Sequence, residues 1–510
     1  MCGQTELKHG LSKAAWVVLA VGLIAFLFSS GRWNIFITAW IWPAAFLYFS
    51  RSADSVRDFL PLAAAIAAGN AVRWLNVLDA GGVIDAVLSL IWSVCWILPF
   101  VVDRLLYKRL PGWLSTLLLP GVFVSLEFLR HFTLVGSYGV TAYTQTGILP
   151  LVQSVSLIGS FGLSFLILWF APVLLHVCGN KRKGWGAAAV YGGVLLTVLV
   201  FGFIRLNTAQ GAAETVRVAS VVGPYYRKFS DATYETISYE ESVAYLLSEA
   251  DRAASDGAEI ACWNEEAFSI PDTKEADFLE TAAEFAEENR MVLILAYETE
   301  DTDGSEAGLT VNKLVILQPD GSRTDYVKTH LVPVIEEPYY VKGTGAVPTV
   351  RTDRGVLSAV ICFDDSYVSF NHGFGAEMSG DFSDTDILFV PSWDWRSVAK
   401  AHTKSSEFRA VENGYALVKP TYDGLSAAVD RWGRELMLSS TDESGFDSVR
   451  CVDIPLEGKQ TFYGRHGTVL DLFFAGIGAV PVCAGLFFPV RRPVRQPVWQ
   501  PVWRKEDERD

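Results

Sequence analysis

The chain has 510 residues, of which 50% are hydrophobic and 19% charged, and its formal net charge at pH 7 is −15. Its 57 acidic and 42 basic side chains are too many for a protein buried wholly in lipid, so one part is predicted to span a bilayer and another to be soluble. The excess of acid excludes nucleic acid as a partner, because a protein that binds a polyanion needs a basic face.

Eight apolar segments are candidates for transmembrane helices, which need about 20 mostly apolar residues. The segments are 14–30, 33–49, 59–78, 83–102, 113–128, 151–176, 185–204 and 469–490. The first seven predict a seven-span transmembrane domain at residues 1–206, and the last predicts an eighth transmembrane helix at 468–490. The first segment could instead be a signal peptide, but it lacks a clear A-x-A-like cleavage site and further spans follow.

Lysine and arginine gather in every second connection between these segments. They are Lys8, Lys13, Arg51, Arg57, Arg104, Lys108, Arg109, Lys181, Arg182, Lys183, Arg491, Arg492 and Arg495. The intervening connections hold few, among them Arg32 and Arg130. Because short cytoplasmic loops carry the excess of positive charge, both termini are predicted to be cytoplasmic and residues 205–467 to lie outside the cytoplasm. The basic and aromatic tail at 491–510 is predicted to lie near the membrane surface on the cytoplasmic side.

Residues 215–456 are rich in aspartate and glutamate and contain no apolar run of membrane length, so they predict a soluble domain. Short apolar runs at 216–222, 291–296 and 386–390 are typical of buried strands. The segments 240–255 and 277–289 carry apolar residues at helical spacing, with acidic side chains on the opposite face. Strands that alternate with helices indicate an α/β layered domain.

Three reactive side chains of this domain each follow a predicted strand. They are Glu265, Lys328 and Cys362, and the strand before the cysteine is the apolar run 357–361. The carboxyl end of a strand is the usual place for a site on an open α/β sheet. The seven cysteines of the chain are scattered without a C-x-x-C pair, which indicates neither a zinc site nor a disulfide framework. At least one cysteine is therefore free to be a nucleophile.

These three side chains are chemically complementary. A thiol becomes a good nucleophile where a carboxylate accepts its proton and a cation favours the thiolate, and the same cation can stabilise an oxyanion. Cys362 would attack, Glu265 would act as general base and then acid, and Lys328 would steady the tetrahedral intermediate. Taken singly, each has an ordinary alternative as a buried small side chain, a loop carboxylate or a solvated lysine. Their joint occurrence favours catalysis.

The sequence around these residues carries several recognisable motifs. They are 326–333 followed by Glu336, Trp263 with Glu265, 360–362, Trp395, His402, 409–414, Asp423 with Gly424, 461–467, 127–130 and 142–145. Together they resemble the bacterial apolipoprotein N-acyltransferases of the nitrilase (carbon-nitrogen hydrolase) superfamily over most of the chain. The resemblance implies a multi-span α-helical membrane domain and an extracytoplasmic α/β domain with the nitrilase-like α-β-β-α sandwich.

The resemblance also implies an activity. A membrane phospholipid would donate a fatty acyl group to Cys362 as a thioester, and the N-terminal amine of diacylglyceryl-cysteine in a diacylated lipoprotein would accept it. Glu336, Phe363, Asp364 and Trp395 would support the catalytic residues, although Glu336 could instead be a surface acid beside Glu337. Neither a metal nor a cofactor is expected. The implied location is the bacterial cytoplasmic (inner) membrane, with the catalytic domain on the periplasmic side among membrane lipids.

The chain departs from the family's pattern at three places. Asn264 stands where proline is usual, Phe363-Asp364 where tyrosine-glutamate is usual, and Val334-Ile335 where phenylalanine-glycine is usual. Phe363 lacks a hydroxyl and Asp364 is one methylene shorter, so the hydrogen bonds near the nucleophile must be remade. These departures bear on substrate identity and efficiency rather than on acyl chemistry.

Three other functions remain open from the sequence. A membrane-tethered nitrilase-type amidase, or an acyltransferase with a different amine acceptor, would use the same three residues. A non-enzymatic membrane scaffold would leave an intact cysteine, glutamate and lysine set without a purpose. A transporter is disfavoured because the apolar segments hold almost no charge near their centres.

Overall fold

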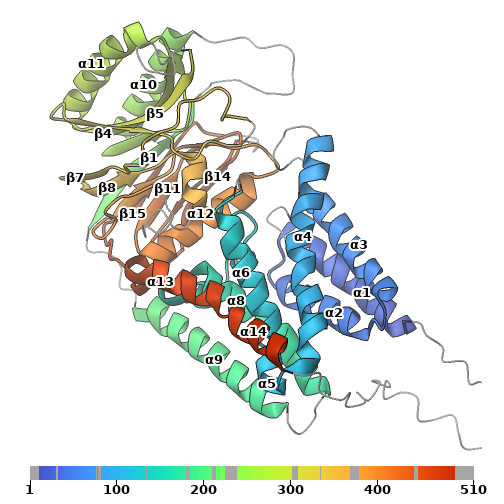
Figure 1. Cartoon of the computed structure of the whole chain (residues 1–510). Helices are drawn as coiled ribbons and strands as arrows, with labels where there is room; N and C mark the ends of the chain where they lie inside the picture. The colour runs from blue at the N-terminus through green and yellow to red at the C-terminus, as the bar shows by residue number, and fades with distance from the viewer. Residues whose placement is uncertain are drawn as a thin grey trace, which may run out of the picture.

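The computed structural model describes residues 11–29, 33–75, 77, 82–133, 135–179, 184–208, 214–223, 238–300, 308–333, 335–367, 378–441 and 446–488. The predicted tail at 491–510 lies outside these residues, as do several of the basic residues that predict the orientation. The chain forms a helical part, built from both ends of the sequence, and an α/β domain built from its middle (Figure 1).

The helical part contains eleven of the α-helices in the described residues. They are α1 (Lys13–Leu27), α2 (Thr38–Ser52), α3 (Val56–Arg73), α4 (Gly82–Leu106), α5 (Gly112–Ser115), α6 (Leu118–His131), α7 (Leu149–Val152), α8 (Val155–Gly179), α9 (Trp185–Thr208), α13 (Phe462–Gly476) and α14 (Ala479–Phe487). Each predicted apolar segment overlaps one or two of them. Three segments are each divided between two helices: the fifth between α5 and α6, the sixth between α7 and α8, and the eighth between α13 and α14.

Within the part of the chain that the structure describes, five helical stretches are long and apolar enough to cross a membrane: Gly82–Arg109, Gly112–His131, Val155–Gly179, Trp185–Thr208 and Phe462–Phe487. They correspond to the fourth to eighth predicted segments. The first three segments fall short for different reasons: α1 is apolar but has 15 residues, and α3 includes Arg57, Asp58 and Arg73. A full crossing by these three remains a prediction.

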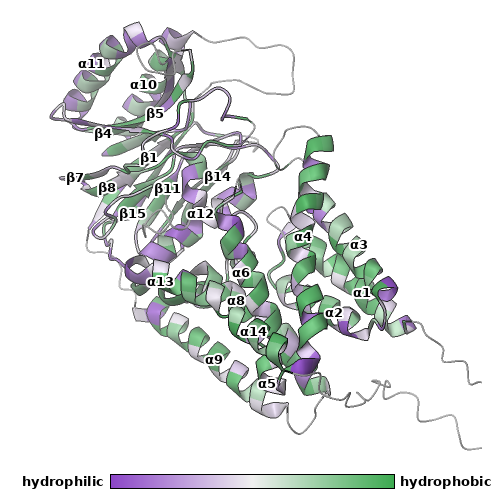
Figure 2. Cartoon of the chain, viewed as in Figure 1, coloured by the Kyte–Doolittle hydropathy of each residue, from purple (hydrophilic) through white to green (hydrophobic). Residues whose placement is uncertain are grey.

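Aromatic side chains fill the centre of the helical part. Phe26, Trp42, Phe46, Trp96, Phe100 and Phe123 contact one another, with ring centroids 5.2 to 6.4 Å apart and mostly edge-to-face geometry. Such pairs add about 0.5–1.5 kcal/mol each beyond the burial of their surface. The outward faces of these helices are also largely hydrophobic (Figure 2), as expected of helices that face lipid.

The α/β domain contains two large sheets. The seven-stranded sheet has the order β15 (Val449–Pro455), β1 (Thr215–Val221), β2 (Ile260–Trp263), β4 (Val292–Glu300), β5 (Thr310–Leu317) and β6 (Arg323–Val327), with β3 (Ser269–Ile270) also paired to β4. The six-stranded sheet has the order β14 (Glu435–Ser440), β13 (Leu425–Val429), β11 (Ala416–Lys419), β9 (Ile387–Phe389), β8 (Gly355–Ala359) and β7 (Thr349–Thr352). The runs predicted at 216–222, 291–296 and 386–390 are thus β1, β4 and β9.

The two sheets pack face to face between helices. One buried cluster joins Ile260 and Ile294 of the first sheet to Leu357 and Leu417 of the second. Helices α10 (Tyr239–Ser255) and α11 (Asp272–Asn289) cover the outer face of the seven-stranded sheet, and α12 (Ala399–Asn413) lies on the other side, against the helical part (Figure 1). The predicted α-β-β-α sandwich is confirmed.

Helix α12 joins the domain to the helical part through a buried polar cluster. Arg409 pairs with Glu412 at 2.8 Å and donates to the Tyr143 hydroxyl at 2.6 Å. Glu412 in turn accepts a hydrogen bond from the Ser160 backbone N–H at 2.8 Å. Buried charges are tolerated only when paired and hydrogen-bonded, so this cluster fixes α12 against α8.

Gly159 provides a test of this junction, because its φ is 65° inside α8 and an added Cβ would lie 2.1 Å from the Tyr463 ring. Gly159→Ala should destabilise the protein by about 2–5 kcal/mol, through a left-handed backbone and overpacking. Gly192→Ala is the matched control, because its added methyl meets no atom within 4 Å. Thermal unfolding in detergent should show a clearly lower midpoint for Gly159→Ala alone. Equal midpoints would contradict this account of the packing.

Candidate active site

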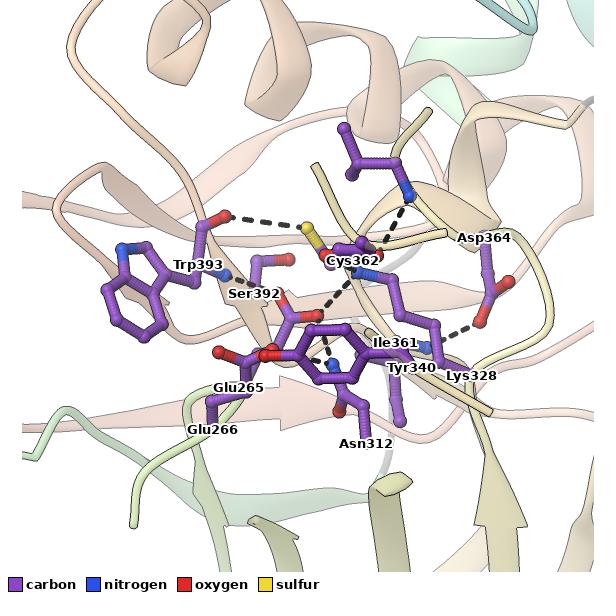
Figure 3. Close-up of polar contacts among 12 residues, drawn as sticks. Glu265, Glu266, Asn312, Lys328, Tyr340, Ile361, Cys362, Asp364, Ser392 and Trp393 are labelled. Atoms are coloured by element: carbon purple, nitrogen blue, oxygen red, sulfur yellow. Dashed lines mark hydrogen bonds and ion pairs between the residues drawn. The ribbon is translucent and has the colours of Figure 1, made fainter. Parts of the chain in front are cut away.

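Glu265, Lys328 and Cys362 come together where the two sheets meet (Figure 3). Glu265 lies two residues after β2, Lys328 directly follows β6, and Cys362 lies three residues after the end of β8. The first two belong to the seven-stranded sheet and the cysteine to the six-stranded sheet. The face-to-face packing of the sheets therefore brings together residues that are far apart in the sequence.

Lys328 is held between two carboxylates. Its Nζ lies 2.7 Å from Glu265 Oε1 and 2.7 Å from Glu336 Oε1, and its side chain has an exposed fraction of 0%. Burial by itself would lower the pKa of this lysine, but the charges of Glu265 and Glu336 raise it well above the usual value. Lys328 is therefore a cation over the whole physiological pH range.

Glu265 accepts three hydrogen bonds. Lys328 Nζ and Asn312 Nδ2 donate to Oε1, the latter at 2.8 Å, and the Trp393 backbone N–H donates to Oε2 at 2.7 Å. The carbonyl oxygen of the same Trp393 accepts from Cys362 Sγ, at a long 3.6 Å. The main chain of Trp393 thus contacts both the carboxylate and the thiol, and both lie on one side of the site (Figure 3).

Cys362 is buried and conformationally strained. Its φ is 46°, in the left-handed region that costs a non-glycine residue free energy and is frequent at functional sites. The Cys362 N–H donates to Pro391 O at 2.9 Å, and a short 3-10 helix (Cys362–Ser366) begins at this residue. Burial, and next the negative charge of Glu265, raise the pKa of the thiol well above its usual value. The resting group is a thiol, which needs a base at the moment of attack.

Asp364 ties the lysine loop to the cysteine turn. Its Oδ2 accepts from the Tyr326 hydroxyl at 2.8 Å and from the Ile361 N–H at 3.2 Å, and its Oδ1 accepts from the His330 N–H at 2.7 Å. Both oxygens of the Asp364 carboxylate thus accept hydrogen bonds. Phe363 makes no hydrogen bond with its side chain and instead packs edge-on against Tyr367 at 5.5 Å.

More carboxylates surround Glu265 than its motif predicted. Glu266 has a φ of 50°. The Asn312 amide that donates to Glu265 also donates to Glu266, with Nδ2 3.1 Å from Oε1. Burial first, and then the charges of Glu298 and Glu265, raise the pKa of Glu266 well above its usual value. The pKa of Glu336 is also raised, chiefly by burial. Burial and the neighbouring carboxylates thus favour the neutral form of Glu266.

A second charged cluster, absent from the predicted catalytic set, lies behind the cysteine. His402 pairs with Asp394 at 2.7 Å and with Asp365 at 3.0 Å. Burial and Lys419 lower the pKa of His402, but the two aspartates outweigh them and raise it to about 9. The pKa of Asp365 is lowered to about 2, because Lys419 and His402 outweigh its burial. His402 belongs to a sequence motif, whereas Asn312 lies inside β5 and carries no sequence signal.

Two groups of side chains could ligate a metal by their spacing. The donor atoms of Cys362, Asp394 and His402 lie within 4.8 Å of one another, as do those of Glu265, Glu266 and Glu336. In the second group the Lys328 ammonium already contacts two of the three carboxylates. The lysine thus supplies the cation that these acids require.

An apolar cavity of about 50 Å³ opens next to Cys362. Val332, Phe363, Trp395 and Val398 line it on the side of the α/β domain, and Trp74, Val77, Val135 and Tyr138 line it on the side of the helical part. Trp395 Nε1 donates to Val77 O at 3.1 Å, which joins the two walls. Residues of the predicted membrane domain thus form one wall of this cavity, beside the thiol.

Two known domain families match this chain. Residues 238–462 match the model of the carbon-nitrogen hydrolases, and residues 13–173 match the model of the apolipoprotein N-acyltransferase N-terminal domain. Among solved structures, the α/β domain is similar to an amidase from a Nesterenkonia species, with 17% identity, a TM-score of 0.38, and 48% of this chain and 92% of that chain covered.

Curated relatives cover most of the chain. Apolipoprotein N-acyltransferase of Geobacter metallireducens is 26% identical, with 79% of this chain and 80% of the relative covered. Apolipoprotein N-acyltransferase of Rhodopseudomonas palustris is 28% identical, with 72% and 73% covered. The domain match assigns residues 238–462 to the carbon-nitrogen hydrolase domains. With its N-terminal domain and these relatives, the chain belongs to the apolipoprotein N-acyltransferase family.

Glu265 and Glu266 offer a matched pair for testing the general base. Glu265→Gln should lower acyl-transfer turnover by about 10²–10⁴-fold, because the amide cannot take a proton. Glu266→Gln should stay within about threefold of the wild type, because burial favours the neutral form of Glu266 and Lys328 pairs with Glu265 and Glu336 instead. Steady-state turnover of the purified proteins checks this. Equal losses for both variants would mean that the two carboxyls act as one unit.

Proposed function

We propose that this enzyme transfers a fatty acyl group from a membrane phospholipid, through a thioester on Cys362, to the N-terminal amine of diacylglyceryl-cysteine in lipoproteins. One observation carries the proposal: a buried cysteine, glutamate and lysine cluster opens into an apolar cavity that the turns after α3 and α6 of the membrane part help to form. Such a cavity suits an acyl chain, and its position suits substrates that reside in a bilayer.

In the first half-reaction, Cys362 Sγ bonds to the ester carbonyl carbon of the phospholipid while Glu265 takes the thiol proton. The tetrahedral oxyanion is stabilised by Lys328. On its collapse the carbon–oxygen bond to glycerol breaks, Glu265 returns the proton to the leaving oxygen, and a lysophospholipid departs. Stabilisation by one such donor is typically worth about 10²–10³-fold in rate.

In the second half-reaction, the lipoprotein amine attacks the thioester carbonyl carbon. Glu265 takes a proton from the amine, the carbon–sulfur bond breaks, and the proton passes to the Cys362 thiolate. Glu336 holds Lys328 in place through both steps, and its other oxygen accepts from the Val332 N–H at 2.8 Å. Asp364 and Trp395 position the cysteine turn and the cavity wall.

The thioester is testable on purified protein. A fluorescent-acyl phospholipid should leave a hydroxylamine-labile label on the wild type and none on Cys362→Ala. Cys262→Ala and Cys451→Ala are the controls and should label like the wild type, because neither side chain lines the cavity. Loss of label in either control would reassign the nucleophile.

The choice of acceptor distinguishes acyl transfer to an amine from hydrolysis of the thioester. A diacylated peptide with a free N-terminal amine should discharge the thioester and gain one acyl chain in mass spectrometry. The same peptide with a blocked amine should leave the thioester intact, because a transferase site excludes water. If water alone discharges it as fast as the amine does, the membrane-tethered amidase becomes the correct function.

The chain is a bacterial inner-membrane protein, and we propose that its α/β domain faces the periplasm with both termini in the cytoplasm. In a variant with serine at positions 2, 178 and 483, Glu284→Cys on the exposed face of α11 should react with a membrane-impermeant maleimide added to spheroplasts. Asp54→Cys, between α2 and α3, should react only after lysis. The reverse pattern would invert the topology.

A further inference from the structure

A second cavity, rich in arginine and lysine, adjoins the active-site cavity. It has a volume of about 230 Å³ and lies between the helical part and α12, and Arg73, Arg130, Lys400, Lys404 and Glu435 are among its lining residues. Trp74 and Tyr138 line both cavities, and their rings contact each other edge-on at 5.5 Å. One aromatic pair thus separates the reactive thiol from a cluster of cations.

Arg130 is the main indication that this cavity binds an anion. It is 4% exposed, and no described residue accepts a hydrogen bond from its Nε or Nη2. Glu127, one turn earlier on α6, uses its Oε1 to accept from the Thr141 N–H and hydroxyl, and within the described residues it makes no ion pair with Arg130. A buried donor without an acceptor costs about 1–3 kcal/mol, and more when charged, so the site favours a ligand that supplies oxygen atoms.

Arg73 adds a second guanidinium in a fixed position. It stacks on Phe26 at 4.3 Å and on Trp96 at 4.8 Å, and its Nη2 donates to Ser29 O at 3.2 Å. Its Nε and Nη1 are buried and have no acceptor among the described residues. The aromatic contacts hold the guanidinium but satisfy none of these N–H groups, which are therefore left available to a ligand.

The charge of the cavity is unbalanced. Four cations line it with the single carboxylate of Glu435. Lys404 is paired with that carboxylate at 2.5 Å and with Glu407 at 2.6 Å, so the charges of Arg73, Arg130 and Lys400 remain. Two guanidinium groups with free N–H donors match the geometry of phosphate oxygens. The ligand class is therefore a phosphate ester or free phosphate.

On the basis of the proposed function, we infer that Arg73 and Arg130 bind the phosphodiester of the acyl-donor phospholipid. The ester carbonyl and the phosphodiester are joined by one glycerol, so a donor with its carbonyl at Cys362 needs a phosphate site in an adjacent cavity. The walls support a lipid rather than free phosphate, because Trp42, Trp74 and Trp96 of the membrane part also line this cavity. The arginines thereby position the ester for attack.

Two acyl donors test this inference on the full-length protein in detergent. A glycerophospholipid carries the phosphodiester, and the p-nitrophenyl ester of the same fatty acid lacks it. Arg130→Met and Arg73→Met should slow single-turnover labelling of Cys362 by the phospholipid about 10- to 100-fold, the effect of losing a charge-assisted hydrogen bond. Labelling by the neutral ester should change less than about threefold.

Arg57→Met is the matched control, because Arg57 is an exposed residue at the opposite end of α3 from Arg73. It should label normally with both donors. Equal losses with both donors in the Arg130 and Arg73 variants would assign these arginines a structural role, and no loss with either donor would also overturn the inference. If the wild type accepts neither donor, the thioester function itself fails, which is a separate outcome.

Inorganic phosphate distinguishes the two possible sources of the anion. At constant ionic strength it should compete only weakly with phospholipid labelling of the wild type, because it lacks the acyl chains. Strong binding of inorganic phosphate that depends on Arg130, together with phospholipid labelling that does not, would assign the cavity to free phosphate and overturn the lipid site.

Discussion

The catalytic domain depends on one constraint, a buried lysine that must be neutralised by two carboxylates. Lys328 Nζ lies 2.7 Å from both Glu265 and Glu336, out of contact with solvent. Removing one partner of a buried ion pair typically costs about 3–5 kcal/mol, because the remaining charge is left uncompensated. The end of β2, the end of β6 and the loop that carries Glu336 must therefore meet at one point. Cys362 also lies at that meeting point (Figure 3).

The departures from the family's motif are absorbed by local hydrogen bonds. Asp364 reaches the Tyr326 hydroxyl and the N–H groups of Ile361 and His330, so a shorter carboxylate still joins the lysine loop to the cysteine turn. Behind the turn, His402 lies between Asp394 and Asp365. These contacts hold the strained backbone of Cys362 in place, because strain at a functional site persists only where the surrounding structure maintains it.

The helical part contributes to the site as well as to membrane residence. It forms one wall of the cavity beside Cys362, and together with α12 it encloses the arginine-lined cavity next to it. Trp395 and the Arg409–Glu412 pair fix the α/β domain against these helices. A lipid bound between the two parts would therefore present its ester to the thiol without leaving the membrane part of the molecule.

The sequence by itself determined the division into apolar and soluble regions, the α/β sandwich and the family, because hydrophobic periodicity and motifs are local in the chain. It also singled out Glu265, Lys328, Glu336 and Cys362. It could not show that Asn312 and the main chain of Trp393 bind Glu265, or that Glu266 joins the carboxylate cluster. Nor did it connect Arg73 with Arg130, which are brought together by the packing of α3 against α4 and of α4 against α6. Only the tertiary structure decided these contacts, because burial and charge pairing depend on which segments pack together, and neither is encoded in the spacing along the chain.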